Sequence, residues 1–268
     1  MKKSSIVIAI LLLFSLPIHA KKSRFVSMGP SVTESLYAVG LGDQVVGASK
    51  YCNYPAVVES LPRVGTSFSP NIERLVALAP DMVFSQALAD LSFEQKMRAL
   101  KLKVTTLGFN TYEEILKSLD QLIKIAKKKK GLKIVNDIRK EEALLKKLKL
   151  SGQGLVVIEA KVKLSKLSEL MIAGGDSYLG DIIRMTGLEV KSSSKSYYYY
   201  SLEKLLLSPP DFIYLIRLKK NERKLLIDFL KERGLEKTKV IALNQDYSNI
   251  PGPRISLLMR EIYESHRN

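Results

Sequence analysis

An internal repeat limits the folds that this chain can adopt. Residues 71–84 (NIERLVALAPDMVF) align without gaps on residues 201–214 (SLEKLLLSPPDFIY), at an offset of 130 residues. Each copy begins with a residue suited to a helix N-cap, carries a glutamate two positions later, and ends in Pro-Asp followed by an apolar run. Pro-Asp after a helix is a common turn signal, so a coincidental pair is the alternative. Recurrence at close to half the chain length favours two similarly built lobes.

Short β-rich runs alternate with segments of helical periodicity along the rest of the chain. We predict strands at residues 25–28, 45–48, 82–85, 104–107, 155–159, 212–216 and 240–243. We predict helices at residues 33–39, 72–78, 92–100, 177–186, 202–207 and 222–233. Alternation of this kind predicts an α/β fold with largely parallel sheets.

A long helical stretch, from about Tyr112 to Leu148, separates the two groups of strands. It carries the lysine run 127–130 and has Leu and Ile at three- and four-residue spacings, which is typical of a helix with one apolar face. We therefore predict an N-terminal lobe over residues 21–110, a single interlobe helix over 111–149 and a C-terminal lobe over 150–268.

The first twenty residues are typical of a secretory signal peptide. Lys2 and Lys3 precede an apolar run at 6–16, and Ala20 is a small residue suited to cleavage. The run is short for a membrane span, which needs about 20 apolar residues. We therefore expect an exported, periplasmic protein. Cleavage would remove two lysines and no acid, so that the net charge would fall from +16 to +14.

The scarce residue types exclude most catalytic chemistry. The chain has 1 Cys, 2 His and no Trp, and cleavage would leave His266 as the sole histidine. A catalytic triad, a Cys-His dyad and a His-rich metal site all need a positioned imidazole, and we expect a terminal histidine to be frayed and solvated. Cys52 has no histidine to activate it, and the glycines at 173–180 match no nucleotide-binding motif. We therefore predict no enzyme, no resident cofactor and no metal site.

The basic charge alone does not identify a partner. Lysines concentrate at 117–149, on the predicted helical stretch, where a solvated polar face is the usual explanation. Nucleic-acid binding would need basic residues clustered with interleaved aromatics, so we do not expect it. A basic periplasmic polyanion-binding protein remains the alternative from a different functional class.

Several short motifs, in order, resemble one known family. They are Arg24–Glu34, Leu41–Gly47, Tyr51–Pro55, Leu61–Gly65, Asn71–Leu75 and Pro251–Arg254. Together they resemble the solute-binding proteins of ABC importers for cobalamin, haem and ferric siderophores, and most closely the cobalamin-binding type. The resemblance implies two Rossmann-like lobes joined by one interlobe helix, with a metal-chelate cargo held between them by a monomeric protein.

The resemblance also implies a role for the two glutamates of the repeat. Glu73 and Glu203 fall where the family places acids that dock onto arginines of a dimeric permease in the inner membrane. From the residues alone, stabilisation by the helix macrodipole, about 0.3–1 kcal/mol, would account for either of them.

The resemblance implies five cargo contacts. Tyr51 matches an aromatic against the ligand, Phe68 lies near a cleft-wall aromatic, and Tyr197 stands where cobalamin-binding relatives carry a tryptophan. Tyr198 belongs to the same tyrosine run, whose alternative is an aromatic loop packed into the second lobe. Arg254 could meet a polar group of the ligand or remain a solvated first-turn arginine. We expect a cobalamin-type corrinoid as cargo, and haem or a ferric siderophore is the alternative that the tyrosine-rich run and the absence of Trp favour.

Overall fold

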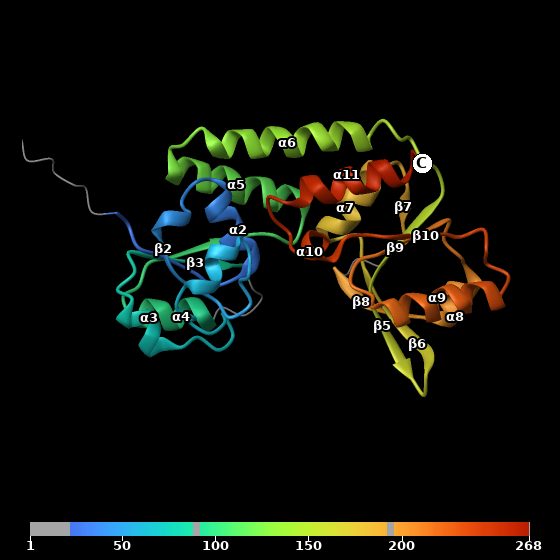
Figure 1. Ribbon diagram of the computed structural model, residues 1–268, viewed down its shortest axis with the longest axis horizontal. Helices are drawn as coiled ribbons and strands as arrows, with labels where there is room; N and C mark the ends of the chain where they lie inside the picture. Colours follow the sequence, from blue (N-terminus) through green and yellow to red (C-terminus); the bar gives the residue numbers. More distant parts are fainter. Residues whose placement is uncertain (1–21, 88–91, 192–195, 268) are drawn as a thin grey trace, which may run out of the picture.

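The computed structural model describes residues 22–87, 92–191 and 196–267, and it has two α/β lobes beneath a layer of helices (Figure 1). The predicted two-lobed α/β class is therefore confirmed. The predicted signal peptide lies outside the described residues. In the part of the chain that the structure describes, no helix is long and apolar enough to cross a membrane.

The first lobe is built on a four-stranded parallel sheet. Its strands are β1 (Phe25–Ser27), β2 (Val45–Ala48), β3 (Met82–Gln86) and β4 (Val104–Leu107), in the order β2-β1-β3-β4. Its helices are α2 (Pro30–Ala38), α3 (Ile72–Ala77) and α4 (Ser92–Ala99), with short 3-10 turns at Gly42–Gln44 and Ala56–Ser60. The predicted strands of this half are all present. β1, β2 and β3 are short apolar runs that the sheet largely buries, whereas β4, at the edge of the sheet, is half-exposed.

The second lobe has a mixed sheet, where we had predicted largely parallel strands. Its strands are β5 (Gln153–Lys163), β6 (Lys166–Ala173), β7 (Glu189–Val190), β8 (Tyr197–Ser201), β9 (Phe212–Leu215) and β10 (Lys239–Ala242). The order is β10-β9-β5-β6-β8, with β7 beside the start of β5. The run β10-β9-β5 is parallel, and β6 and β8 extend it in antiparallel fashion. The tyrosine run is thus a strand, and the loop interpretation is wrong.

Five helices complete the second half of the chain. They are α7 (Tyr178–Met185), α8 (Leu202–Leu207), α9 (Lys220–Glu232), α10 (Gln245–Ser248) and α11 (Ile255–Ser265). Helices α8 and α9 lie on the lobe itself, whereas α7 and α11 lie close to the helical layer that covers the junction (Figure 1). The C-terminal helix therefore returns from the second lobe to the centre of the molecule.

The predicted single interlobe helix is instead a pair of helices. Helix α5 (Tyr112–Ala126) ends at Lys127, whose φ of 52° is left-handed, and α6 (Lys130–Leu145) then turns back along it. Gly131 permits this close packing, because a Cβ there would lie 2.4 Å from Cγ1 of Ile123. Only α6 extends above both lobes in Figure 1, and it leads to the start of the second sheet. The two lobes are therefore joined through a helical hairpin and not through one continuous helix.

One apolar core joins the lobes and the helical layer. Its largest cluster includes Phe84 of the first sheet, Leu119 of α5, Ile138 of α6 and Tyr214 of the second sheet, all fully buried. Arg260 of α11 also donates to buried Glu141 of α6, with its Nε 2.8 Å from Oε2. The lobes therefore share their interior with α5, α6 and α11.

The repeat corresponds to equivalent structures in the two lobes. Asn71 and Ser201 cap α3 and α8 by accepting hydrogen bonds from the backbone three residues on. The aspartates of the two Pro-Asp pairs also have the same role: Asp81 Oδ2 accepts from the Arg24 backbone N–H at 2.7 Å. Asp211 Oδ2 accepts from the Gln153 backbone N–H, also at 2.7 Å. Each aspartate precedes one strand (β3 or β9) and accepts a hydrogen bond from the start of the neighbouring strand (β1 or β5).

The expectation of a frayed, solvated His266 is wrong. Its Nε2 lies 2.6 Å from the hydroxyl oxygen of Tyr214, and its ring packs edge-on against Phe212 at a centroid distance of 4.9 Å. Burial, helped by the positive charge of Lys239, lowers the pKa of this histidine. The imidazole is thus a half-buried packing group beneath the end of α11.

The repeated aspartate bonds should stabilise both lobes equally. We expect Asp81→Ala and Asp211→Ala each to lower the free energy of unfolding by roughly 1–2 kcal/mol, because each removes a charge-assisted hydrogen bond to a strand N–H. Urea denaturation measures this change. Asp120→Ala is the control, since Asp120 forms an exposed ion pair with Lys124 whose loss should cost less than about 0.5 kcal/mol. Variants that unfold like this control would contradict the shared role.

Candidate functional site

The carboxyl ends of the parallel strands in both sheets meet at the junction between the lobes. Strand β1 leads into α2, whose Glu34 contacts Arg254 ahead of α11. Past the end of β4, the carbonyl of Asn110 accepts a hydrogen bond from the backbone N–H of Tyr178, 2.6 Å away at the start of α7. Open α/β sheets bind ligands outside the carboxyl ends of their strands. The junction is therefore the candidate site.

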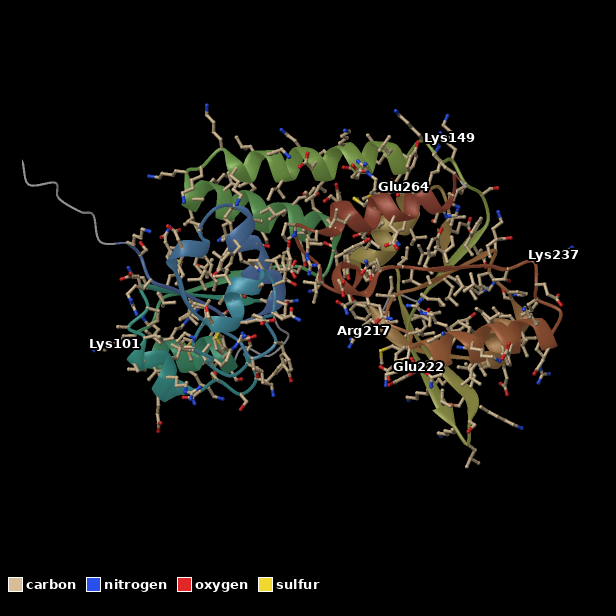
Figure 2. All side chains as sticks on the ribbon, in the orientation of Figure 1. Lys101, Lys149, Arg217, Glu222, Lys237 and Glu264 are labelled. Atoms are coloured by element: carbon tan, nitrogen blue, oxygen red, sulfur yellow. The ribbon has the colours of Figure 1, made fainter. Side chains whose placement is uncertain are left out.

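A cavity of about 240 Å³ lies on the second-lobe side of this junction. It is lined by Ile158, Met171, Tyr178, Leu179, Tyr197, Ile216, Arg217 and Asn249. Figure 2 shows Arg217 on the side of the second lobe that faces the first. Arg217 is not among the residues predicted from the sequence, although its position just after a predicted strand of a parallel sheet was an available signal.

Tyr197 is the predicted cargo residue that lines this cavity. It is the first residue of β8, paired with Ala173, and its side chain remains 45% exposed. Burial of the hydroxyl raises the pKa of Tyr197 to about 12, so the phenol stays neutral at physiological pH. It therefore offers an aromatic face and a hydrogen-bond donor.

The other tyrosines of the run have different surroundings, because strand side chains alternate between faces. Tyr198 packs with Tyr200 against the apolar core beneath α8 and α9, so it does not join Tyr197 in the cavity. Tyr199 shares the face of Tyr197, and Lys161 Nζ lies 3.4 Å from the centroid of its ring. The expectation that Tyr198 lines the cleft is corrected accordingly.

Tyr51 and Phe68 are exposed aromatics on neighbouring loops of the first lobe. Tyr51 follows β2 and is 63% exposed, and Phe68 precedes α3 and is 73% exposed. The Lys50 backbone N–H donates to the carbonyl of Gly65 at 3.0 Å, which joins the two loops. Tyr51 lies at the carboxyl end of the sheet, and this bond brings the Phe68 loop beside it.

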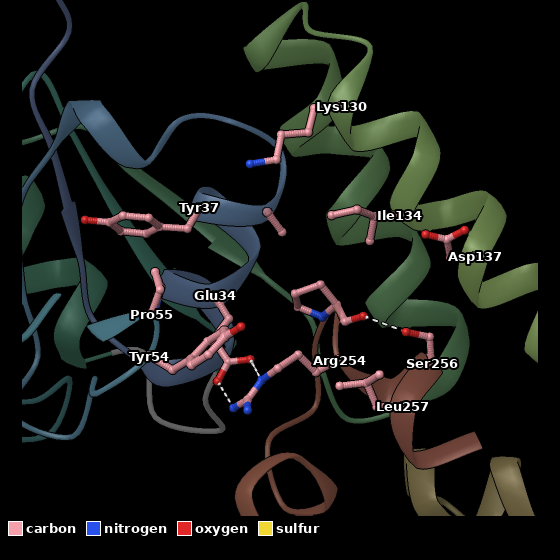
Figure 3. Close-up of a pocket in the computed structure, with 12 residues that line it drawn as sticks. Glu34, Tyr37, Tyr54, Pro55, Lys130, Ile134, Asp137, Arg254, Ser256 and Leu257 are labelled. Atoms are coloured by element: carbon pink, nitrogen blue, oxygen red, sulfur yellow. Dashed lines mark hydrogen bonds and ion pairs between the residues drawn. The ribbon is translucent and has the colours of Figure 1, made fainter. Parts of the chain in front are cut away.

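Arg254 forms a buried ion pair and does not line the cavity of Tyr197. Its Nε donates to Glu34 Oε2 at 2.7 Å and its Nη2 donates to Oε1 at 2.5 Å, while the Tyr54 ring lies 4.1 Å from the guanidinium carbon (Figure 3). Burial raises the pKa of Glu34, and the hydrogen bond from Arg254 opposes that effect. Its partner, Glu34, is 220 residues away in the sequence, so no local pattern could predict the pair.

Arg254 instead borders a separate groove of about 420 Å³ between α2, α6 and α11 (Figure 3). Tyr37 and Pro55 line it from the first lobe, and Ile134 and Leu257 line it from the helical layer. The predicted cargo contact is therefore corrected to a tie between the first lobe and the C-terminal segment.

Glu73 and Glu203 occupy equivalent exposed positions, one on each lobe. Each lies in the first turn of a six-residue helix, α3 or α8, on the side of the molecule away from α6 (Figure 1). Leu75 and Leu205 anchor these helices to their lobes and are fully buried. The structure thus presents a matched pair of carboxylates, as the repeat predicted.

Two further features limit the chemistry of the described residues. No group of three or more His, Cys, Asp or Glu side chains among them is arranged to hold a metal ion. On α5 and α6 several exposed lysines form ion pairs with acids one turn away, as in the pairs Lys124–Asp120 and Lys133–Asp137. This mixed-charge face does not favour polyanion binding.

The fold is that of a two-lobed α/β protein, and its candidate site lies at the junction of the lobes. The chain belongs to the periplasmic binding protein family, whose sequence model matches residues 26–247. The predicted family is confirmed, and with it a transport component in place of an enzyme.

Named relatives agree with this class. The chain is 25% identical over 265 residues to a vitamin B12-binding protein of Vibrio vulnificus, covering 96% of this chain and 94% of the relative. Its fold is similar to that of the periplasmic vitamin B12-binding protein of Vibrio cholerae, with a TM-score of 0.75, 22% identity and coverage of 91% and 96%. It is also similar to a periplasmic haem-binding protein of Vibrio cholerae, with a TM-score of 0.74, 19% identity and coverage of 92% and 98%.

The Glu34–Arg254 pair should behave as a structural tie. We expect Arg254→Met to lower the free energy of unfolding by about 3–5 kcal/mol, because it leaves a buried carboxylate without its partner. Combining it with Glu34→Leu should restore most of that loss, as measured by denaturant titration of the single and double variants. Asp43→Ala, which breaks the exposed Lys22–Asp43 pair, should cost under about 1 kcal/mol. An Arg254→Met protein as stable as the parent would contradict the tie.

Proposed function

We propose that this protein captures a cobalamin-type corrinoid between its lobes and delivers it to an ABC importer. The observation that carries the proposal is the set of exposed aromatic side chains at the junction: Tyr51 and Phe68 on one lobe and Tyr197 on the other. Flat aromatic faces suit a large planar macrocycle, and Arg217 adds a positive charge beside Tyr197.

The size of the cavity supports a ligand that extends across the cleft. A volume of about 240 Å³ falls below the roughly 300–1,000 Å³ typical of a complete small-molecule pocket. In the proposed complex, this cavity takes one edge of the cargo, and the body of the cargo stacks against Tyr51 and Phe68. The vitamin B12-binding relatives support the choice of corrinoid.

Haem or a ferric siderophore is the second candidate cargo. The tyrosine at position 197, the absence of Trp and the likeness to haem-binding structures favour it. Burial raises the pKa of the Tyr197 hydroxyl to about 12, so the phenol is neutral at physiological pH when no metal is bound. Towards a corrinoid, Tyr197 would act as a neutral donor and stacking surface.

Delivery in this proposal uses the two exposed glutamates. An inner-membrane permease dimer with two-fold symmetry would present the same basic surface to each lobe, and Glu73 and Glu203 are the matching acids. The protein would act as a monomer in the periplasm, exported by the signal peptide predicted at residues 1–20. No cofactor of its own is needed, because the metal chelate is the cargo.

Cargo choice can be tested by titrating the purified protein with cyanocobalamin, haemin and ferric chelates. We expect saturable cyanocobalamin binding at micromolar concentration, followed by tyrosine fluorescence or calorimetry. Tyr197→Ala should weaken it about 5- to 30-fold, corresponding to roughly 1–2 kcal/mol of stacking and buried surface. Tyr199→Ala is the matched control: it lies on the same face of β8, is also 45% exposed, and does not line the cavity. Saturable binding of haemin alone would select the second candidate.

Docking can be tested by charge reversal on both lobes. We expect Glu73→Lys combined with Glu203→Lys to reduce cargo uptake at least tenfold in cells, because both lobes would then repel a basic permease surface. Cargo affinity in solution should be unchanged. Glu236→Lys, an exposed site between α9 and β10, is the control and should transport normally. Uptake that survives the double reversal would refute the docking role.

A further inference from the structure

Strands β5 and β6 form a ribbon that continues well beyond the second sheet. Pairing of β5 with β9 ends at Val157, whereas pairing with β6 continues to Lys163 and Lys166. The turn consists of Leu164 and Ser165, both left-handed with φ of 48° and 60°, as in a tight two-residue hairpin. In Figure 1 this hairpin extends past α8 and α9, on the side of the molecule opposite α6.

The turn presents an apolar side chain at the end of this ribbon. Leu164 is 97% exposed, and Val162 nearby is 39% exposed. On α8, Leu207 is also 86% exposed. A groove of about 640 Å³ runs from Ser165 and Lys166 to Leu202 and Glu203, so the turn and α8 border one surface. No other part of the described chain buries this leucine, so its side chain is available to a partner.

Basic side chains flank the apolar tip. Lys163 and Lys166 lie on either side of the turn, are exposed, and have no acidic partner within 4.0 Å among the described residues. The groove beside the turn also carries Arg233 and the acids Glu203, Asp228 and Glu232, so the unpaired positive charge at the tip itself is that of the two lysines. An apolar tip between two exposed lysines is a combination that binds an anionic phospholipid surface, with the tip in the headgroup layer and the ammonium groups on phosphates.

We propose that the β5–β6 turn docks the second lobe onto an anionic phospholipid bilayer through Leu164, Lys163 and Lys166. A lipid surface fits better than a protein pocket, because Leu164 and Lys163 lie outside the groove beside the turn and offer one apolar side chain and a point charge. The placement beside Glu203 also rests on the proposed function, in which that glutamate meets a permease embedded in the same membrane. With a single apolar side chain, the contact is weak and reversible.

The absence of tryptophan from the chain makes a direct test available. We expect the sole tryptophan of a Leu164→Trp protein to shift its emission to shorter wavelength when vesicles of phosphatidylethanolamine with roughly one-third phosphatidylglycerol are added. Phosphatidylcholine vesicles should give little shift, and salt at about 0.5 M should reverse most of it. The matched control is Leu132→Trp on α6, 54% exposed at the opposite side of the molecule, which should show no shift.

Co-sedimentation with the same vesicles gives the complementary measurement. Leu164→Asp should lower the fraction bound about tenfold relative to the unmodified protein, and Leu132→Asp should leave it unchanged. An unshifted Leu164→Trp emission with anionic vesicles, or a shift seen only when the permease is present in them, would overturn the proposal. Cyanocobalamin titration of the Leu164 variants separates the two proposals, because cargo binding uses the cleft and should be retained.

Discussion

The bidentate ion pair between Glu34 and Arg254 is the contact on which the arrangement of the lobes depends. It joins α2 of the first lobe to the segment that leads into α11, and it is nearly closed to solvent. Burying two charges is costly unless each satisfies the other, so this geometry admits one relative position of the two segments. A second ion pair, between Arg260 and Glu141, joins α11 to α6 in the same way. These two ion pairs fix the relative positions of the elements that pack together in the shared apolar core.

This construction restricts how the cleft can open and close. A wide hinge motion would have to break the Glu34–Arg254 pair, separate the Tyr178 N–H from the Asn110 carbonyl, and expose the apolar core beneath α5 and α6. Each of these steps leaves buried polar or apolar groups without partners. In the proposed complex, the aromatic residues at the junction would therefore act as a largely preformed surface.

Local patterns in the sequence predicted the helices and strands of the lobes well, because N-caps, turns and short apolar runs act over a few neighbouring residues. The repeat at residues 71 and 201 predicted equivalent capped helices and strands, and both aspartates make the same strand contact. Long-range contacts were not predictable in this way. The helix break at Lys127 depends on packing of Gly131 against Ile123, and the role of Arg254 depends on an acid near the other end of the chain. Four consecutive tyrosines gave no alternation of polarity, so strand β8 and the inward position of Tyr198 could be seen only once β6 was beside it.

The reassignment of Arg254 changes the charge expected at the cleft. Arg254 is held by Glu34 and lines a separate groove, whereas Arg217 is the positive side chain beside Tyr197. A guanidinium and a neutral phenol are both hydrogen-bond donors, so this wall of the site suits a cargo edge rich in acceptors such as carbonyl or phosphate oxygens. A corrinoid carries amide carbonyls around its rim and a phosphate on its nucleotide loop, whereas haem offers two carboxylates on one edge. In the proposed complex, the cavity would therefore bind the periphery of the macrocycle, and the exposed aromatics Tyr51 and Phe68 would contact its flat face.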